Sequence, residues 1–178
     1  FYWRSERMSE NSIYISVVIP LYNKRNAIAA TLQSVLSQTY TNYEIIVVDD
    51  GSTDESAEVA ETILQECTAY GVECKGNVIR KANGGVSSAR NRGIQETKYD
   101  YIALLDGDDL WDEHYLEEQV KLIQDFPVAK MWGVNYAFVK YGITTKYNQG
   151  LVEGFIGYVK KDFETKHGDL YCSSSVVI

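Results

Sequence analysis

The chain alternates between short, uninterrupted apolar runs and longer segments with one apolar face. Ile13 to Ile19 is continuous and rich in β-branched residues, and Glu44 to Val48 repeats this pattern. Such runs are typical of strands buried on both faces of a parallel sheet. Pro20 is expected to end the first strand. Val78 to Arg80 and Tyr101 to Leu105 predict two further strands.

Segments with helical periodicity separate these runs. Apolar side chains recur every three or four positions in them, as in a helix with one buried face. Ser52 and Glu55 match a capping box at the start of the second helix. The helices are predicted over residues 26–38, 54–67, 86–97 and 111–124.

The resulting order, βαβαβαβ, predicts an α/β fold. Each crossover is long enough for a helix, so the strands are expected to be parallel and covered by helices. After Pro127 the pattern changes, and no internal repeat or domain boundary is evident. In this second part we predict strands over residues 128–139, 142–147 and 171–178, and a short helix over 155–163.

Length and charge narrow the function classes. The 178 residues suffice for one domain with its own core. The net charge of −8 disfavours nonspecific binding to nucleic acid or to an anionic membrane. No apolar run reaches the roughly 18 residues of a membrane span, and no signal-peptide pattern opens the chain.

Cysteine and histidine usage argues against a disulfide framework and a zinc site. The cysteines, Cys67, Cys74 and Cys172, form no C-x-x-C pair, and His114 and His167 are isolated. We therefore expect reduced thiols in a cytoplasmic protein, with at most peripheral attachment to the inner face of a membrane.

The unusual residues follow the predicted strands. In an open parallel sheet, ligands bind beyond the carboxyl ends of the strands, so the four loops there are expected to converge on one edge. These loops contain Pro20–Lys24, Asp49–Asp50, Lys81–Gly85 and Asp106–Asp109.

The acidic turn after the fourth strand has two interpretations, of which the first is a divalent-ion site. Asp106 and Asp108 flank a glycine, so both side chains can turn towards one point. Hard carboxylate oxygens suit Mg2+ or Mn2+, which can in turn hold a diphosphate. The alternative is a solvated turn in which Asp109 or Asp112 caps the next helix. The motif alone leaves both interpretations open.

The turn after the second strand is equally ambiguous. Asp49, Ser52 and Asp54 can simply end the strand and cap a helix. Asp50 at the strand tip could instead accept hydrogen bonds from a base N–H or a ribose hydroxyl. Tyr22 could stack on that base or be an ordinary surface tyrosine.

The segment NGGVSSARNRG matches neither a dinucleotide fingerprint nor a Walker A loop. Gly84 and Gly85 permit a sharp turn and close approach to a ligand. Arg90 or Arg92 could pair with an aspartate of the site, although a solvated helix face is the preferred interpretation for Arg92.

The second part of the chain offers weaker candidates. Aromatic residues there could line an acceptor groove, but packing is the simpler explanation in a chain with 14 tyrosines. His167 and Asp169 are possible acid–base groups. The aromatic candidates are Tyr141, Tyr147, Tyr158 and Trp132.

Four segments, in order, resemble family 2 glycosyltransferases of the GT-A fold: VVIPLYNK, SVLSQTYTNYEIIVVDDGSTD, NGGVSSARNRGI and YIALLDGDDLW. The resemblance covers Ile15 to Val120, and SSSVVI is similar to the family's later acceptor-side strand. It implies a single domain with a Rossmann-like, mostly parallel sheet flanked by helices. We expect a tail over 1–12, a nucleotide-sugar-binding half over 13–127 and, over 128–178, the start of an acceptor half truncated at the C-terminus.

The resemblance also implies an activity, a hexosyltransferase-type reaction of class EC 2.4. The expected enzyme transfers a sugar with inversion from a UDP-sugar to a carbohydrate or lipid-linked acceptor, in surface polysaccharide synthesis. Asp108 would bind Mn2+ or Mg2+, Asp109 would support the site, and Asp106 would face the ribose or sugar. The donor-binding residues implied are Pro20, Tyr22, Asp50, Lys81, Asn83, Gly84, Gly85, Arg90, Asp106 and Asp109.

The catalytic base is the missing part. In this family it normally lies in an acidic motif beyond the strand that resembles SSSVVI, so we expect it beyond Ile178 and expect this chain to turn over poorly. A noncatalytic nucleotide-sugar-binding module is the alternative. A nucleotidyltransferase would need a glycine- and basic-rich phosphate loop, which PLYNKRN matches poorly.

Overall fold

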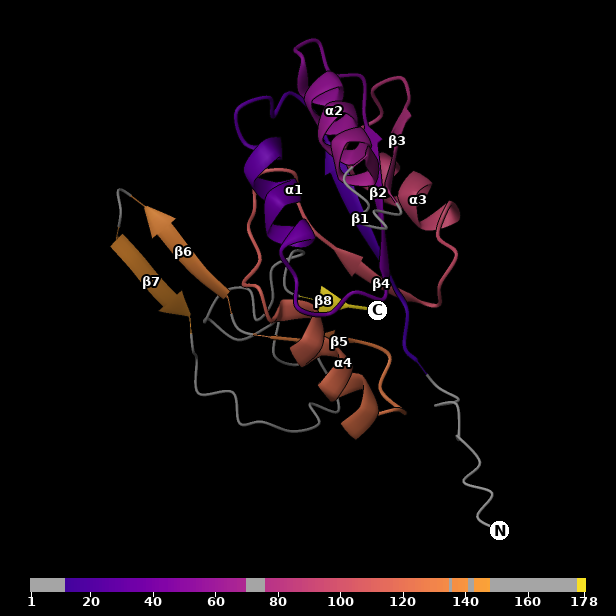
Figure 1. The fold of residues 1–178 in the computed structure, drawn as a ribbon, viewed down its shortest axis with the longest axis vertical. Coiled ribbons are helices and arrows are strands. Elements are labelled where there is room, and N and C mark those ends of the chain that lie inside the picture. The colour runs from indigo at the N-terminus through magenta and orange to yellow at the C-terminus, as the bar shows by residue number, and fades with distance from the viewer. Residues whose placement is uncertain (1–11, 70–75, 135, 141–142, 148–175) are drawn as a thin grey trace.

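A computed structural model describes residues 12–69, 76–134, 136–140, 143–147 and 176–178. It confirms the α/β class and the parallel order of the first four strands (Figure 1). The central sheet has the strand order β3-β2-β1-β4-β8-β5. Its strands are β1 (Ile15–Leu21), β2 (Tyr43–Asp49), β3 (Gly76–Arg80), β4 (Tyr101–Leu104), β5 (Trp132–Gly133) and β8 (Val176–Val177).

The first four strands are parallel, whereas β8 lies antiparallel between β4 and β5. A separate antiparallel pair, β6 (Tyr136–Lys140) and β7 (Ile143–Tyr147), stands apart from this sheet (Figure 1). The sheet is therefore mostly parallel, as the resemblance implied.

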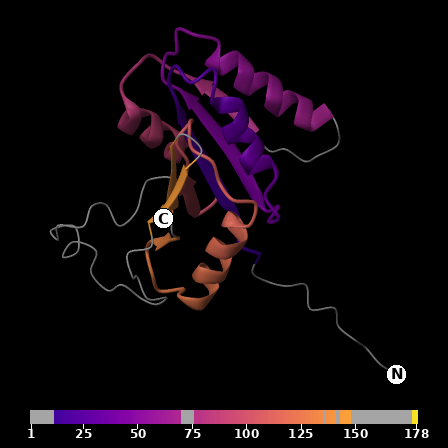
Figure 2. The same cartoon turned by 90° about the vertical axis from the view of Figure 1, so that its left-hand side faces the viewer.

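Helices cover both faces of the sheet. Alternate residues of β1 serve the two faces: Val17 packs in the core under α1, α2 and α4, and Val18 packs against Ala89 of α3. Figure 2 shows α2 and α3 on opposite sides of the strands. Burial on both faces explains why the strands read as continuous apolar runs. The helices are α1 (Ile28–Leu36), α2 (Ser56–Ala69), α3 (Val86–Gln95) and α4 (Tyr115–Asp125).

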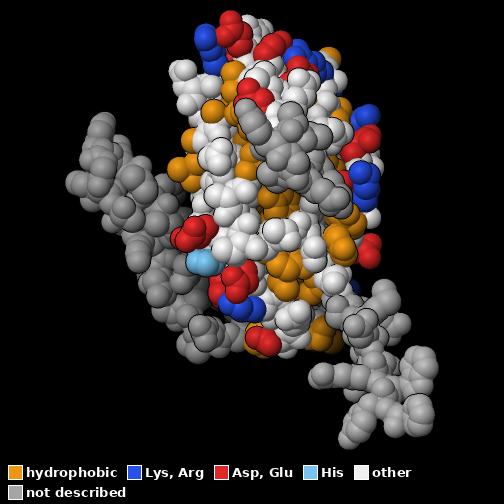
Figure 3. All heavy atoms as spheres, viewed as in Figure 1, with side chains coloured by type: hydrophobic (Ala, Val, Ile, Leu, Met, Phe, Trp, Pro, Cys, Tyr) orange, Lys and Arg blue, Asp and Glu red, His pale blue; other side chains and the backbone are white. Residues whose placement is uncertain are grey.

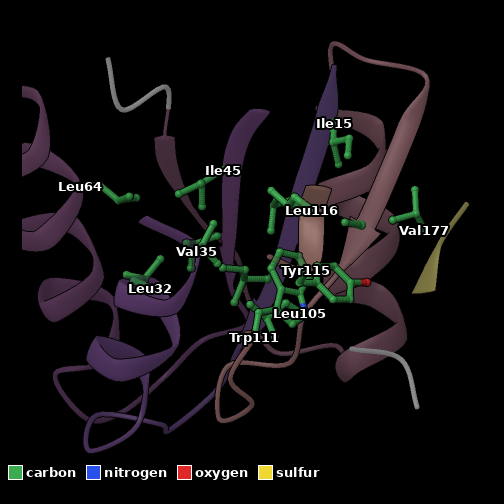
Figure 4. Packing of buried hydrophobic residues seen from close by; sticks show 14 of the residues in the cluster. Ile15, Leu32, Val35, Ile45, Leu64, Leu105, Trp111, Tyr115, Leu116 and Val177 are labelled. Atoms are coloured by element: carbon green, nitrogen blue, oxygen red, sulfur yellow. The ribbon is translucent and has the colours of Figure 1, made fainter. Parts of the chain in front are cut away.

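The larger core lies on the face of α1, α2 and α4. Leu32, Leu64 and Leu116, one from each helix, converge on the strands (Figure 4). Trp111 stacks on Tyr115 with ring centroids 4.1 Å apart, which closes the core below the loop after β4. This core holds the strands and helices that flank the loops after β1, β2 and β4.

On the other face, Gly93 brings α3 close to the sheet. A β-carbon at Gly93 would lie 2.3 Å from Cγ1 of Val18, so α3 or Val18 would have to shift to accommodate it. The glycine therefore sets the distance between α3 and β1, and with it the position of Arg90 on the same helix.

Several predicted boundaries are wrong. β1 runs through Pro20 to Leu21, because β4 pairs only with Ile15–Val18 and Pro20 lies beyond that ladder. The capping box of Ser52 and Glu55 does not form. Instead α2 begins at Ser56, whose backbone N–H donates to Oδ1 of Asp54 at 3.0 Å.

The last predicted elements are divided or fall partly outside the described residues. The strand predicted over 128–139 is split between β5 and β6, and the helix predicted over 111–124 starts only at Tyr115. The helix predicted over 155–163 lies outside the described residues. Of the strand predicted over 171–178, β8 is the described part.

Candidate functional site

The carboxyl ends of β1, β2 and β4 meet at one edge of the sheet, the upper edge in Figure 1. The Asp50 N–H donates to the carbonyl oxygen of Leu21 at 2.8 Å, and a β-carbon on Gly107 would lie 3.1 Å from the carbonyl oxygen of Pro20. Strands β2 and β4 flank β1 and run about 10 Å apart, and β2 ends opposite Leu21 whereas β4 ends opposite Val18. The predicted convergence of the loops is confirmed. Figure 3 shows acidic and basic side chains next to one another along this edge.

Asp50 is the most buried carboxylate of the edge, with 3% of its side chain exposed. It accepts hydrogen bonds from the N–H groups of Gly84, at 3.0 Å, and Gly85, at 2.7 Å, and it pairs with the ammonium of Lys81. Burial alone would raise the pKa of Asp50, but these donors outweigh it and hold the pKa below its ordinary value. The ionised carboxylate of Asp50 therefore fixes the position of the glycine turn after β3.

Asp106, in the turn after β4, forms an ion pair with a residue of α3, the helix on the face of the sheet opposite α1, α2 and α4. Nη2 of Arg90 lies 2.5 Å from Oδ1 of Asp106, and both side chains are partly buried. This confirms the expected pairing of an arginine with a site aspartate. Arg92 pairs instead with Glu96 of its own helix at 2.7 Å, as the solvated-face interpretation predicted.

Asp108 stands at the exposed tip of the acidic turn. Its Oδ2 lies 2.6 Å from Nζ of Lys24, and 46% of its side chain is exposed. Asp109 closes the turn by donating its backbone N–H to the carbonyl oxygen of Asp106 at 3.0 Å. The alternative of a cap holds for Asp112 and not for Asp109, because Oδ1 of Asp112 accepts the N–H of His114, the N-cap of α4, at 3.0 Å.

The donor set suits a metal held jointly with a ligand. Within the residues that the structure describes, no three His, Cys, Asp or Glu side chains gather into a metal cage. Mg2+ in proteins often takes only one or two carboxylates and completes its shell with water and substrate phosphates. The exposed carboxylate of Asp108 fits that arrangement.

The remaining donor-site candidates line the same edge. Tyr22 directly follows β1 and is 45% exposed, whereas Pro20 is buried within the strand. Asn83 is exposed, and its backbone nitrogen lies 2.9 Å from where a β-carbon of Gly51 would stand. Gly51 has φ +77°, so a glycine there lets the loops after β2 and β3 touch.

Sequence reasoning missed how the loops after β1 and β2 are joined. Asn23 adopts φ +51° and donates its N–H to Oγ of Ser52 at 3.0 Å, while its Oδ1 accepts the N–H of Thr53 at 2.8 Å. The N–H of Lys24 donates to Oγ of Ser56 at 2.8 Å. An asparagine two residues after a strand was the available signal, because asparagine tolerates the left-handed region.

Candidates in the second part of the chain are corrected or not described. Trp132 does not line a groove: it is buried in the core, donates Nε1–H to the carbonyl oxygen of Phe126 at 3.2 Å and packs edge-on against Tyr101. The side chain of Tyr147, and all of Tyr141, Tyr158, His167 and Asp169, lie outside the described residues.

A surface hollow lies at the opposite edge of the sheet, where β1 and β4 begin. It is lined by residues such as Tyr14, Lys98 and Tyr99, and it contains none of the candidate residues. The site chemistry therefore rests on the loops at the carboxyl edge and not on this hollow.

Solved structures with the same architecture are glycosyltransferases of the GT-A fold. S. aureus TarS in complex with UDP-GlcNAc aligns with a TM-score of 0.54 and 27% identity over 65% of this chain and 32% of that chain. The mannosyltransferase PcManGT from Pyrobaculum calidifontis, solved with GDP-Man and Mn2+, aligns with a TM-score of 0.60 over 68% and 35%. At 21% identity the second likeness shows the fold alone.

The amino-acid sequence identifies the protein family. Residues 16–176 match glycosyl transferase family 2, and the chain belongs to this family. Glycosyltransferase GlyA of Streptococcus pneumoniae is 34% identical over 124 residues, 70% of this chain and 17% of that protein. GlyG of the same organism is 37% identical over 112 residues, 62% of this chain and 35% of that protein. The chain thus spans about a third or less of these two relatives.

None of the helices in the described part of the chain combines the length and the apolar character that crossing a membrane requires.

Proposed function

We propose that the carboxyl edge of the sheet binds a UDP-sugar together with Mn2+ or Mg2+, and that the whole protein transfers the sugar with inversion to an acceptor hydroxyl. The observation that carries this proposal is the placement of Asp50 and Asp108 in the turns after β2 and β4, the two strands that flank β1. TarS has been solved with UDP and with UDP-GlcNAc, and PcManGT with GDP-Man and Mn2+, which supports a nucleotide-sugar donor.

In this proposal, different residues of the edge bind the nucleoside, the ion and the sugar. The nucleoside lies between Tyr22, which is exposed for stacking, and the glycine turn held by Asp50. Asp108 is the protein ligand of the ion, which neutralises charge on the departing diphosphate when bound. Asp106, held by Arg90, faces the ribose or the sugar.

The acceptor side needs a general base. In an inverting reaction a carboxylate takes the proton of the acceptor hydroxyl as that oxygen attacks the anomeric carbon from the face opposite the diphosphate. The family resemblance implies that this base lies beyond Ile178, and we assign it to none of the described carboxylates. A role in surface polysaccharide synthesis, with a carbohydrate or lipid-linked acceptor, follows from the same resemblance.

A donor screen by thermal denaturation tests the proposal. We expect UDP and UDP-sugars to raise the melting temperature with Mn2+ or Mg2+ present and to lose this effect in chelator. If GDP-mannose raised the melting temperature and UDP did not, the proposed donor would carry guanine in place of uracil. The absence of a shift with every nucleotide, with or without metal, would overturn the proposed site.

A further inference from the structure

One ion pair at this edge joins a cation to the proposed metal ligand. Nζ of Lys24 lies 2.6 Å from Oδ2 of Asp108, although 84 positions separate them in the sequence. The two side chains are 42% and 46% exposed, so solvent screens the pair and the contact is readily exchanged. The ammonium therefore holds a carboxylate oxygen that the divalent ion would need.

We propose that Lys24 is a built-in competitor of the metal that becomes a ligand of the donor. Without donor, Lys24 neutralises Asp108 and weakens binding of the free ion. When ion and donor arrive together, Lys24 leaves Asp108 and binds the diphosphate. This inference rests on the proposed function, because it assigns a second cation to the same diphosphate.

The exchange is favoured by charge and by the tether of Lys24. A divalent ion at Asp108 repels the ammonium of Lys24. It also carries twice the positive charge of the ammonium, so it attracts the carboxylate more strongly. Lys24 cannot drift far, since its backbone N–H is held by Oγ of Ser56 at 2.8 Å. Its flexible four-carbon stem can then turn towards the anionic oxygens of a diphosphate bound to the ion.

The neighbouring cations do not fit this role. Lys81 pairs with the buried carboxylate of Asp50, and Arg90 pairs with the partly buried Asp106. Arg25, next to Lys24 in sequence, pairs with Glu55 at 2.9 Å. Lys24 differs from these cations because its partner is the proposed metal ligand.

The exchange predicts that ion and nucleotide strengthen each other's binding. Mn2+ alone must displace Lys24 without compensation, whereas Mn2+ with UDP gives the ammonium a new anionic partner. By linkage, UDP then raises the affinity for Mn2+ by the factor by which Mn2+ raises the affinity for UDP. Removing the ammonium should reduce this mutual factor.

The test compares Lys24→Met with Arg25→Met, which removes one positive charge from the adjacent position. Free Mn2+ is measured by electron paramagnetic resonance during titration, and UDP affinity by calorimetry at saturating Mn2+. For Lys24→Met we expect Mn2+ alone to bind about three- to tenfold more tightly than in wild type, and UDP to bind about fivefold more weakly. Arg25→Met should leave both affinities near wild type, and Asp108→Asn should remove the Mn2+ site.

The two parts of the experiment separate the inference from the proposed function. Equal Mn2+ affinity in Lys24→Met and Arg25→Met, or no Mn2+ binding that depends on Asp108, overturns the role of Lys24. Tighter Mn2+ binding in Lys24→Met while wild type binds no UDP supports the competition and overturns the proposed function. Unchanged UDP affinity in Lys24→Met overturns the contact with the diphosphate.

Discussion

The carboxylate of Asp50, with 3% of its side chain exposed, pairs with the ammonium of Lys81 where the adjacent strands β2 and β3 end. Two backbone N–H groups of the glycine turn complete the shell of this carboxylate. A buried carboxylate would be costly without these partners. The position of the turn, and with it one wall of the proposed nucleoside pocket, therefore depends on the charge of a single residue.

Asp50→Asn should lower the free energy of unfolding by about 2 kcal/mol at neutral pH, because charge-assisted hydrogen bonds are lost. The folded-state pKa of Asp50 lies below its ordinary value of 3.8. Its contribution is therefore fully present above that value and is lost as the pH falls through the folded-state pKa. Urea denaturation at several pH values checks this.

The difference in unfolding free energy between wild type and Asp50→Asn, the stability gap, should therefore decrease below about pH 4. Asp100→Asn is the matched control, since Asp100 is exposed and lies just before β4 at the opposite edge of the sheet. A gap that stays constant from pH 7 to pH 3 would show that the charge of Asp50 is not what holds the turn.

Asn23 allows a test of backbone strain against side-chain bonding. Asn23→Ala loses the hydrogen bond to Thr53 and places an alanine at φ +51°, so we expect a loss of about 2 kcal/mol in unfolding free energy. Asn23→Gly loses the same bond but tolerates this φ, so its loss should be about 1 kcal/mol or less. Equal losses in the two variants, measured by chemical denaturation, would rule out a backbone contribution.

Gly93→Ala should destabilise the protein by about 1–3 kcal/mol, because the new methyl group meets Val18. The cost should fall when Val18→Ala is introduced first, since the contacting atom is then absent. Denaturation of the two single variants and the double variant gives the coupling. Strictly additive losses would contradict the close contact between α3 and β1.

The part of the fold that depends on local pattern was predictable from the sequence. The parallel βα repeats and the convergence of the acidic and glycine-rich turns follow from apolar runs and crossover lengths. The pairing of an arginine of α3 with a site aspartate was also expected, and Arg90 with Asp106 confirms it. These features need only the order of elements and the rule that parallel strands end at one edge.

What failed depends on contacts between distant segments. Pro20 continues β1 because β4 ends early, which no property of Pro20 itself indicates. The pairing of Lys24 with Asp108 joins loops 84 positions apart, and side chains of ordinary surface type give no signal of such a pair. Trp132, by contrast, lies in the core, as the simpler interpretation of packing predicted.

The central claim is that this edge binds a nucleotide diphosphate through an ion held by Asp108, and calorimetry of UDP binding tests it most directly. Wild type and Asp100→Ala should bind UDP in Mn2+ and lose measurable binding in chelator. Asp108→Ala should show no Mn2+-dependent binding. Equal UDP affinity in Mn2+ and in chelator, or metal-dependent binding that survives Asp108→Ala, would contradict the account.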